Sequence, residues 1–223
     1  MKRFILILIC LGILCIPVRG APSEKLVALT FDDGPSGRYT RRLLDGLEER
    51  NVKATFFLCG YRMEQDRALT ERIFAEGHEI GLHGYSHKPM ENMRSEEVIL
   101  ELKKTRALLP EGCQAVFLRC PGGTCSECTR SCAASLGLSL AYWSVDPRDW
   151  ATDDTATIEK EVVEHIRDGD IILMHDMSTS SVDAALQIID ELTKQGFRFV
   201  TLSRLASAKG TSPTPGTVYS HFR

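Results

Sequence analysis

Short apolar runs alternate along this chain with longer segments whose apolar residues recur every three or four positions. The short runs are rich in β-branched and aromatic residues, which predicts buried strands, and the longer segments have the period of amphipathic helices. Strands are expected over 26–29, 54–60, 78–82, 115–118, 140–145, 170–174 and 197–202. Helices are expected over 39–50, 63–75, 128–136, 155–167 and 182–195, with a further one beginning near Ser95.

The alternation of strand and helix runs about seven times without an internal repeat or a linker, which indicates a single domain over 21–205. A strand that is followed regularly by a helix calls for parallel strands joined by helical crossovers. Both an open doubly wound sheet and a barrel satisfy this pattern.

Polar residues decide between the two architectures, because each group follows the carboxyl end of a different predicted strand. These groups are Asp32 with Asp33, His83 with His87, Arg119, Asp146 with Asp149, and His175. Barrels collect functional residues at that face, whereas an open sheet would spread residues from so many strands too far apart to share a site. We therefore predict an α/β fold of one domain, a distorted (β/α)7 TIM-like barrel.

The two ends of the chain differ in composition from the predicted barrel. Lys2 and Arg3 precede an apolar run over 4–16 and small residues at its exit, which is typical of a secretory signal peptide over 1–20. The run is shorter than the roughly 18 residues of a spanning helix, so a retained anchor is the less favoured alternative. Residues 206–223 are rich in Gly, Ser, Thr and Pro, and we expect them to form a flexible tail.

The charge balance excludes some classes of partner. Cleavage after Gly20 would remove three of the 27 basic residues and none of the 30 acidic ones, which leaves a net charge of −6. Such a balance argues against binding to nucleic acid and against docking on anionic lipid. The expected product is a secreted monomer without a stable membrane span.

Six cysteines would remain after cleavage: Cys59, Cys113, Cys120, Cys125, Cys128 and Cys132. An even number in an exported protein indicates disulfides, although the sequence does not choose among the 15 connectivities that six cysteines permit. We expect at least two bridges within the loop 113–132, with Cys59 free. A small zinc site or a redox pair at Cys125-x-x-Cys128 is the alternative.

Two adjacent carboxylates and two histidines suggest a metal centre. Asp33, His83 and His87 would supply one carboxylate and two imidazoles and leave a coordination position open. That set suits zinc, with iron or cobalt nearly as suitable. The alternative without a metal is that residues 32–35 form an ordinary acidic turn and that the histidines are solvated loop residues.

Five motifs in order make the chain resemble the polysaccharide deacetylase family (carbohydrate esterase family four). They are TFDDGP at 30–35, HGYSH at 83–87, RCPGG at 119–123, DPRDW at 146–150 and LMH at 173–175. The resemblance covers about residues 24–205. It implies enzymes that remove N- or O-acetyl groups from polymers of sugars with the help of a divalent metal.

The resemblance also implies a role for individual residues. Asp32 would be the general base and His175 the general acid, while Asp33, His83 and His87 would bind the metal. Arg119 would orient Asp32. Either Asp146 or Asp149 would then bind Arg119 or the imidazole of His175.

Three further residues would contact the substrate if the resemblance holds. The backbone N–H of Gly122 would serve as an oxyanion donor, and Trp150 and Leu173 would line a pocket for the acetyl methyl group, with Trp143 a weaker candidate. Two departures stand out. Leu82 occupies a position where the family often has Asn, and Cys120-Pro121-Gly122 stands where it often has Pro-Pro-aromatic.

The sequence thus predicts an exported, metal-dependent N-deacetylase of glycans, with peptidoglycan amino sugars as the expected substrate. Chitin oligosaccharides and acetylated xylan are the next candidates. A non-catalytic glycan-binding domain on the same fold is a rival from another class, although Asp32 and His175 are both present. An amidohydrolase of small amides is a second rival, which a narrow, lidded pocket would favour.

Overall fold

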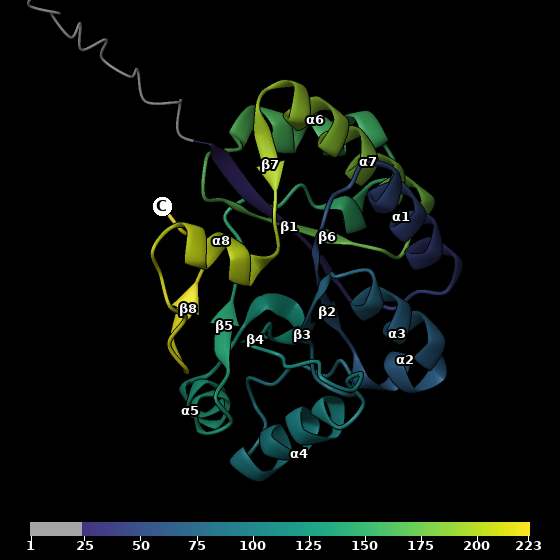
Figure 1. The fold of residues 1–223 in the computed structure, drawn as a ribbon. Helices are drawn as coiled ribbons and strands as arrows, with labels where there is room; N and C mark the ends of the chain where they lie inside the picture. The colour runs from purple at the N-terminus through teal and green to yellow at the C-terminus, as the bar shows by residue number, and fades with distance from the viewer. Residues whose placement is uncertain (1–23) are drawn as a thin grey trace, which may run out of the picture.

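The computed structural model describes residues 24–223, and its elements alternate between strand and helix (Figure 1). The strands are β1 (Lys25–Asp32), β2 (Thr55–Leu58), β3 (Glu79–Leu82), β4 (Phe117–Leu118), β5 (Ser139–Ala141), β6 (Ile171–His175), β7 (Phe197–Phe199) and β8 (Val218–Tyr219). The helices are α1 (Arg38–Glu49), α2 (Gly60–Gln65), α3 (Arg67–Ala75), α4 (Ser95–Arg106), α5 (Glu127–Ser135), α6 (Thr155–His165), α7 (Thr179–Lys194) and α8 (Leu202–Ala208). Two 3-10 turns, η1 (Pro121–Gly123) and η2 (Asp149–Ala151), complete the set.

The strands form one curved parallel sheet in the order β6-β1-β2-β3-β4-β5-β8, and β7 pairs with the first residues of β1. A single parallel bridge between Val145 and Ile172 brings the chain after β5 back to β6. The sheet therefore closes into a distorted barrel. The predicted fold class, an α/β barrel in one domain, is confirmed.

Side chains alternate along the central strand β1 between two cores. Val27, Leu29 and Phe31 face the surrounding helices and belong to the larger core, which also contains residues of α1 and α7. Leu26 and Ala28 face the barrel interior and belong to a second, smaller core. The apolar interior thus fills the lower part of the barrel, and the next side chain on that face, beyond Thr30, is the carboxylate of Asp32.

Helices cover the outside of the barrel on both sides in Figure 1. Helices α1, α6 and α7 lie together beside β1 and β6, and α4 and α5 lie beyond β3, β4 and β5. A third apolar core fills the space under α4 and α5 and includes Leu102 and Ala133. This shell leaves the carboxyl ends of the strands as the face on which polar residues gather.

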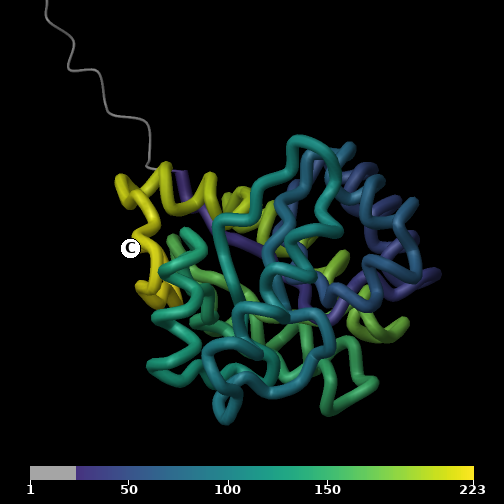
Figure 2. The backbone as a smooth tube through the Cα atoms, turned by 90° about the horizontal axis from the view of Figure 1, so that it is seen from below, coloured from purple at the N-terminus to yellow at the C-terminus, as the bar shows by residue number. Residues whose placement is uncertain are grey.

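The C-terminal residues 206–223 are not the flexible tail that their composition predicts. After α8 the chain returns to the sheet, and β8 pairs with β5 through Val218 and Tyr219. Figure 2 shows this yellow segment lying against the teal and green segment that contains α5 and β5. Phe222 is 3% exposed and stacks on Tyr219. The prediction was wrong because composition does not reveal that β5 needs a strand beside it.

The cysteine pattern differs from the prediction as well. Among residues 24–223 the structure has one disulfide, between Cys120 and Cys125, and not the two or more expected. Cys59 is a free, buried thiol, as predicted. Since Cys125 is bonded to Cys120, the alternative zinc site at Cys125 and Cys128 does not form.

The predicted signal peptide, residues 1–20, lies outside the described residues. Within 24–223 no helix has both the length and the apolar character that crossing a bilayer requires.

Candidate active site

The end of β1 presents two adjacent carboxylates to different partners. Asp32 completes the strand, is 4% exposed and points into the barrel, as strand alternation requires. Asp33 has a φ of 71°, in the left-handed region, so its side chain leaves the strand in another direction. The Asp33 carboxylate meets His83 and His87, with Oδ1 at 3.1 Å and 2.8 Å from their Nε2 atoms.

His83 and His87 follow β3 in a tight polar loop. His83 is buried, and its Nδ1 lies 2.8 Å from the backbone carbonyl of Arg119. Because a carbonyl only accepts hydrogen bonds, Nδ1 carries the proton and Nε2 faces Asp33. The side chain of His87 is 41% exposed, and the Asp33 carboxylate raises its pKa.

These three residues fit a divalent cation. Oδ1 of Asp33 is a buried oxygen without a hydrogen-bond donor, and one atom from each residue lies within 4.8 Å of the others. In neutral imidazoles the two Nε2 atoms are acceptors too, so the three atoms repel one another unless a cation or a proton lies among them. Burial would raise the pKa of Asp33, but hydrogen bonds and charge from His83 and His87 in their protonated forms outweigh it and hold that pKa well below its usual range. The set has the donor types that zinc and cobalt prefer.

Arg119 lies against the carboxylate of Asp32 and is fully buried. Its Nη1 donates to Oδ1 of Asp32 at 2.7 Å and to Oγ1 of Thr30 at 2.8 Å. Its guanidinium also lies over the ring of Phe57, at 4.1 Å from the centroid. Burial lowers the pKa of Arg119, and the charge and hydrogen bond of Asp32 oppose this. Because Arg119 donates to Oδ1, the other oxygen of Asp32, Oδ2, has no hydrogen bond from Arg119.

Asp149 is the partner of His175. Its Oδ1 lies 2.8 Å from the imidazole Nδ1, and its Oδ2 accepts the backbone N–H of His175 at 2.8 Å. This leaves Nε2 as the ring nitrogen available to the site. Burial lowers the pKa of His175, but the hydrogen bond and charge of Asp149, aided by Asp32 and Asp33, raise it to about 9. The imidazole is therefore a cation at neutral pH.

Asp146 contacts neither of the partners that the sequence offered for it. Its Oδ1 accepts the backbone N–H of Arg148 at 2.9 Å and so holds the turn that leads to η2. The turn includes Arg148 in the left-handed region, with a φ of 53°. Of the two aspartates considered, the structure pairs Asp149 with His175 and neither of them with Arg119.

A cavity of about 600 Å³ joins these groups. Ten of the eleven residues singled out in the sequence line it, and Arg119 lies behind its wall: the ten are Asp32, Asp33, His83, His87, Gly122, Asp146, Asp149, Trp150, Leu173 and His175. Trp150 is 62% exposed and stands at the rim, whereas Leu173 is buried on the same strand face as His175. Trp143 also lines the cavity. The exposure of Trp150 and His87 indicates a site open to solvent.

Some lining or supporting residues were not singled out from the sequence. Met177, Ser178 and Ser181, around the start of α7, also line the cavity. Thr30 lies two residues before Asp32, so strand alternation places it on the same face and could have indicated its contact with Arg119. The backbone carbonyl of Tyr142 accepts a hydrogen bond from Arg119, a contact that no residue pattern predicts.

Comparisons with known proteins agree with this geometry. The sequence model of the family described as polysaccharide deacetylase matches residues 19–141. A peptidoglycan-N-acetylglucosamine deacetylase of Bacillus cereus is 36% identical over 84% of this chain and 91% of its own length. The peptidoglycan-N-acetylmuramic acid deacetylase PdaC of Bacillus subtilis is 35% identical over 84% of this chain, which spans 40% of that relative.

A solved structure is similar over the whole barrel. It is a family 4 acetyl xylan esterase from Clostridium thermocellum in complex with a cobalt ion, 34% identical, with a TM-score of 0.82. The alignment covers 88% of this chain and 98% of that one. The family match extends over more than half of the sequence, and the site has the carboxylates and imidazoles of the five motifs. The chain therefore belongs to the polysaccharide deacetylase family of hydrolases.

Proposed function

We propose that this protein is an exported, metal-dependent deacetylase that removes N-acetyl groups from glycans, with the amino sugars of peptidoglycan as its substrate. The observation that carries the proposal is the arrangement around one open cavity of the Asp33–His83–His87 cluster, the separate buried carboxylate of Asp32 and the imidazole that Asp149 holds. Amide hydrolysis needs all three functions at once.

The cation would be held by Asp33, His83 and His87. When bound there, a divalent metal supplies Lewis acidity that polarises a carbonyl oxygen and makes water more acidic. Asp32 lies outside this set of three residues, and its Oδ1 is engaged by Arg119. Its other oxygen, Oδ2, would accept the proton of the water that attacks the acetamide carbon.

His175 would supply the proton that the leaving nitrogen needs. An amine leaves a tetrahedral carbon only when it is protonated, and otherwise the added water is expelled instead. The Asp149 carboxylate keeps the imidazole protonated and fixes the ring through Nδ1, which leaves the N–H at Nε2 for transfer. His175 and Asp32 come from neighbouring strands that pair in register, which supports action on one substrate bond.

The remaining lining residues suit an acetyl group. Leu173 and Trp150 would contact the methyl, and the backbone N–H of Gly122, which lines the cavity, would donate to the developing oxyanion. A polymer can reach this site, because Trp150 and His87 are exposed at the rim. The openness argues against the rival hypothesis of an enzyme for small amides.

Peptidoglycan is preferred as substrate because two relatives, at 36% and 35% identity, are named for it. Acetylated xylan is the second candidate, since the relative from Clostridium thermocellum is named an acetyl xylan esterase. We also propose that residues 1–20 direct the chain out of the cell, where either polymer would be found.

Metal removal tests the proposal. The protein is stripped with a chelator, dialysed, and assayed for acetate release from purified peptidoglycan, chitin oligomers and acetylated xylan. We expect no release from the stripped protein, recovery with zinc or cobalt, and the highest rate on peptidoglycan. His83→Ala should fail to recover at zinc concentrations that saturate the wild type.

Three outcomes would contradict the proposal in whole or in part. Full acetate release by the metal-free protein would exclude the metal-dependent reaction. Binding of zinc without acetate release from any of the three polymers would favour a non-catalytic glycan-binding domain. A rate on acetylated xylan that exceeds the rate on peptidoglycan would move the substrate to the second candidate.

A further inference from the structure

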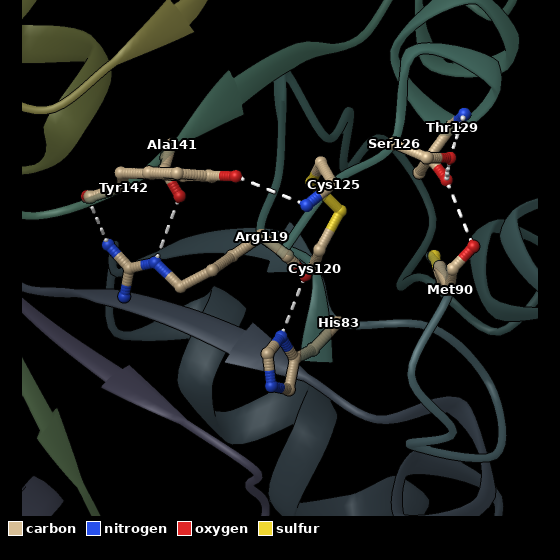
Figure 3. The surroundings of a disulfide bond; sticks show 9 residues. All are labelled: His83, Met90, Arg119, Cys120, Cys125, Ser126, Thr129, Ala141 and Tyr142. Atoms are coloured by element: carbon tan, nitrogen blue, oxygen red, sulfur yellow. Dashed lines mark hydrogen bonds between the residues drawn. A yellow bond between two sulfur atoms is a disulfide. The ribbon is translucent and has the colours of Figure 1, made fainter. Parts of the chain in front are cut away.

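The disulfide between Cys120 and Cys125 closes a small ring of backbone directly after Arg119. Figure 3 shows this ring between Arg119, His83 and Tyr142. The mechanism above uses Arg119 and Gly122 but gives the disulfide no part. Its surroundings indicate that it does more than close a loop.

Arg119 contacts both halves of the site through different atoms. Its backbone carbonyl accepts the Nδ1–H of His83 at 2.8 Å and so sets the orientation of a metal ligand. Its guanidinium donates to Asp32 at 2.7 Å. Any shift of residue 119 would therefore disturb the proposed metal site and the proposed base together.

Tyr142 connects Arg119 to the far end of the ring. Its backbone carbonyl accepts from Nη2 of Arg119 at 2.9 Å, and its hydroxyl oxygen accepts the backbone N–H of Cys125 at 3.2 Å. The contacts form a closed circuit, from Arg119 through Cys120 and the two sulfurs to Cys125, and back through Tyr142 (Figure 3). Both ends of the ring are thus tied to Arg119, one through the peptide bond to Cys120 and the other through Tyr142.

The ring itself carries part of the cavity wall. Gly122 and Gly123 have φ values of 71° and 74°, a conformation that only glycine adopts freely. A side chain at Gly123 would strike Trp143, because an added Cβ would lie 2.7 Å from its ring. Two consecutive glycines would give this wall many alternative conformations if the ring were open.

We propose that the Cys120–Cys125 disulfide and Tyr142 are positioning residues that hold Arg119 and the Gly122–Gly123 turn in the geometry needed for deacetylation. The proposal rests on the proposed function for its effect on turnover. Its effect on metal affinity stands apart from that function, because the carbonyl of Arg119 orients His83 whether or not a substrate is present.

Reduction of the disulfide in the wild-type protein tests the proposal. A phosphine reductant gives two electrons to the disulfide and becomes the phosphine oxide with an oxygen from water, which leaves two thiols. The reductant and its oxide are then removed under nitrogen. Loss of an outer hydrogen-bond partner typically weakens metal affinity or activity about 10–100-fold. We expect reduction to weaken zinc affinity about 10-fold, to lower kcat on peptidoglycan at least as much with little change in KM, and both to recover on reoxidation.

Three variants separate the role of the disulfide and Tyr142 from the general effects of reduction. Cys113→Ser, which removes a thiol outside the ring, should respond to reduction as the wild type does. The double variant Cys120→Ser with Cys125→Ser should have the low values of the reduced protein and no response. Tyr142→Phe keeps the disulfide and the backbone carbonyl but removes the hydroxyl, and its kcat should fall about 10-fold.

The proposal is overturned if the reduced wild type and Tyr142→Phe both keep their zinc affinity and their turnover. It is also overturned if the double variant loses activity only in proportion to its loss of folded protein, measured by near-ultraviolet circular dichroism. If the oxidised protein binds zinc but releases no acetate, the proposed function fails, and the zinc affinities still decide whether the disulfide positions the site.

Discussion

Asp32 and Asp33 are adjacent in the chain and yet have separate partners, because one backbone torsion differs. Asp32 keeps the extended conformation of β1 and meets Arg119, whereas Asp33 turns into the left-handed region and meets two imidazoles. Neighbouring side chains on a regular strand point to opposite faces. The torsion that aims Asp33 at His83 and His87 depends on the turn that follows, which the residue types alone do not specify.

This division predicts opposite defects in two similar variants. Asp32→Asn should keep its zinc affinity but lose about 10²–10⁴-fold in kcat, which is the usual contribution of a general base. Asp33→Asn should lose zinc affinity by more than the roughly 10–100-fold that loss of an outer partner costs. Zinc titration and acetate release on the same preparations measure both quantities. Loss of the metal in Asp32→Asn, together with its retention in Asp33→Asn, would reverse the assignment.

His175 and Asp149 predict the alkaline limit of the reaction. The pKa of His175 is raised to about 9, so the protonated form that donates to the leaving amine is present at neutral pH and is lost as the pH rises through about 9. Asp149→Asn removes the carboxylate that raises this pKa. The alkaline limb of kcat should therefore move to lower pH, at equal zinc occupancy.

Asp153→Asn is the matched control for that measurement, since Asp153 lines the same cavity but bonds Ser180. Its alkaline limb should stay where it is in the wild type. An unchanged limb in Asp149→Asn would mean that another group is the acid.

At the scale of elements, the sequence predicted most strands and helices but not all of their ends. The expected helix over 63–75 divides at Asp66, whose side chain accepts the backbone N–H of Leu69 and begins α3. The expected strand over 197–202 ends at Phe199, and Thr201 caps α8 instead. Hydrophobic period locates an element, whereas a single capping hydrogen bond decides where it stops.

The same limit applies to contacts between elements at the site. Strand ends placed Asp146 and Asp149 near His175, but only the turn into η2 selects Asp149 as its partner. Likewise the clustered cysteines indicated a stapled loop, but Cys128 and Cys132 lie on α5 with their sulfurs against Ser95 at the start of α4, and both are unpaired in the described chain. Residue patterns predict which side chains lie on one face of the barrel. Which of two neighbouring side chains forms a given contact depends on differences of a few ångströms, which the patterns do not specify.

At the scale of the whole molecule, the C-terminal segment completes the barrel. Strand β8 covers the edge of β5, and a bridge between Asp170 and His221 brings the end of the chain to the turn before β6. Phe222 belongs to the smaller core, which contains residues of β1, β2 and β6. The last residues thus contribute to the apolar floor beneath the site.

We therefore expect Phe222→Ala to destabilise the entire domain. Phe222 is 3% exposed, and its backbone N–H donates to the carbonyl of Gly169 at 2.8 Å, so the segment cannot move freely to fill a void. Removal of a core phenylalanine costs about 3 kcal/mol at the low end of the usual range. Urea unfolding should show a lower midpoint with an unchanged slope.

His221→Ala, one residue away and exposed, is the matched control, and it should change the free energy of unfolding by no more than about 0.5 kcal/mol. Equal stability of the two variants would mean that the C-terminal segment is peripheral to the fold, and the barrel would then be complete without it.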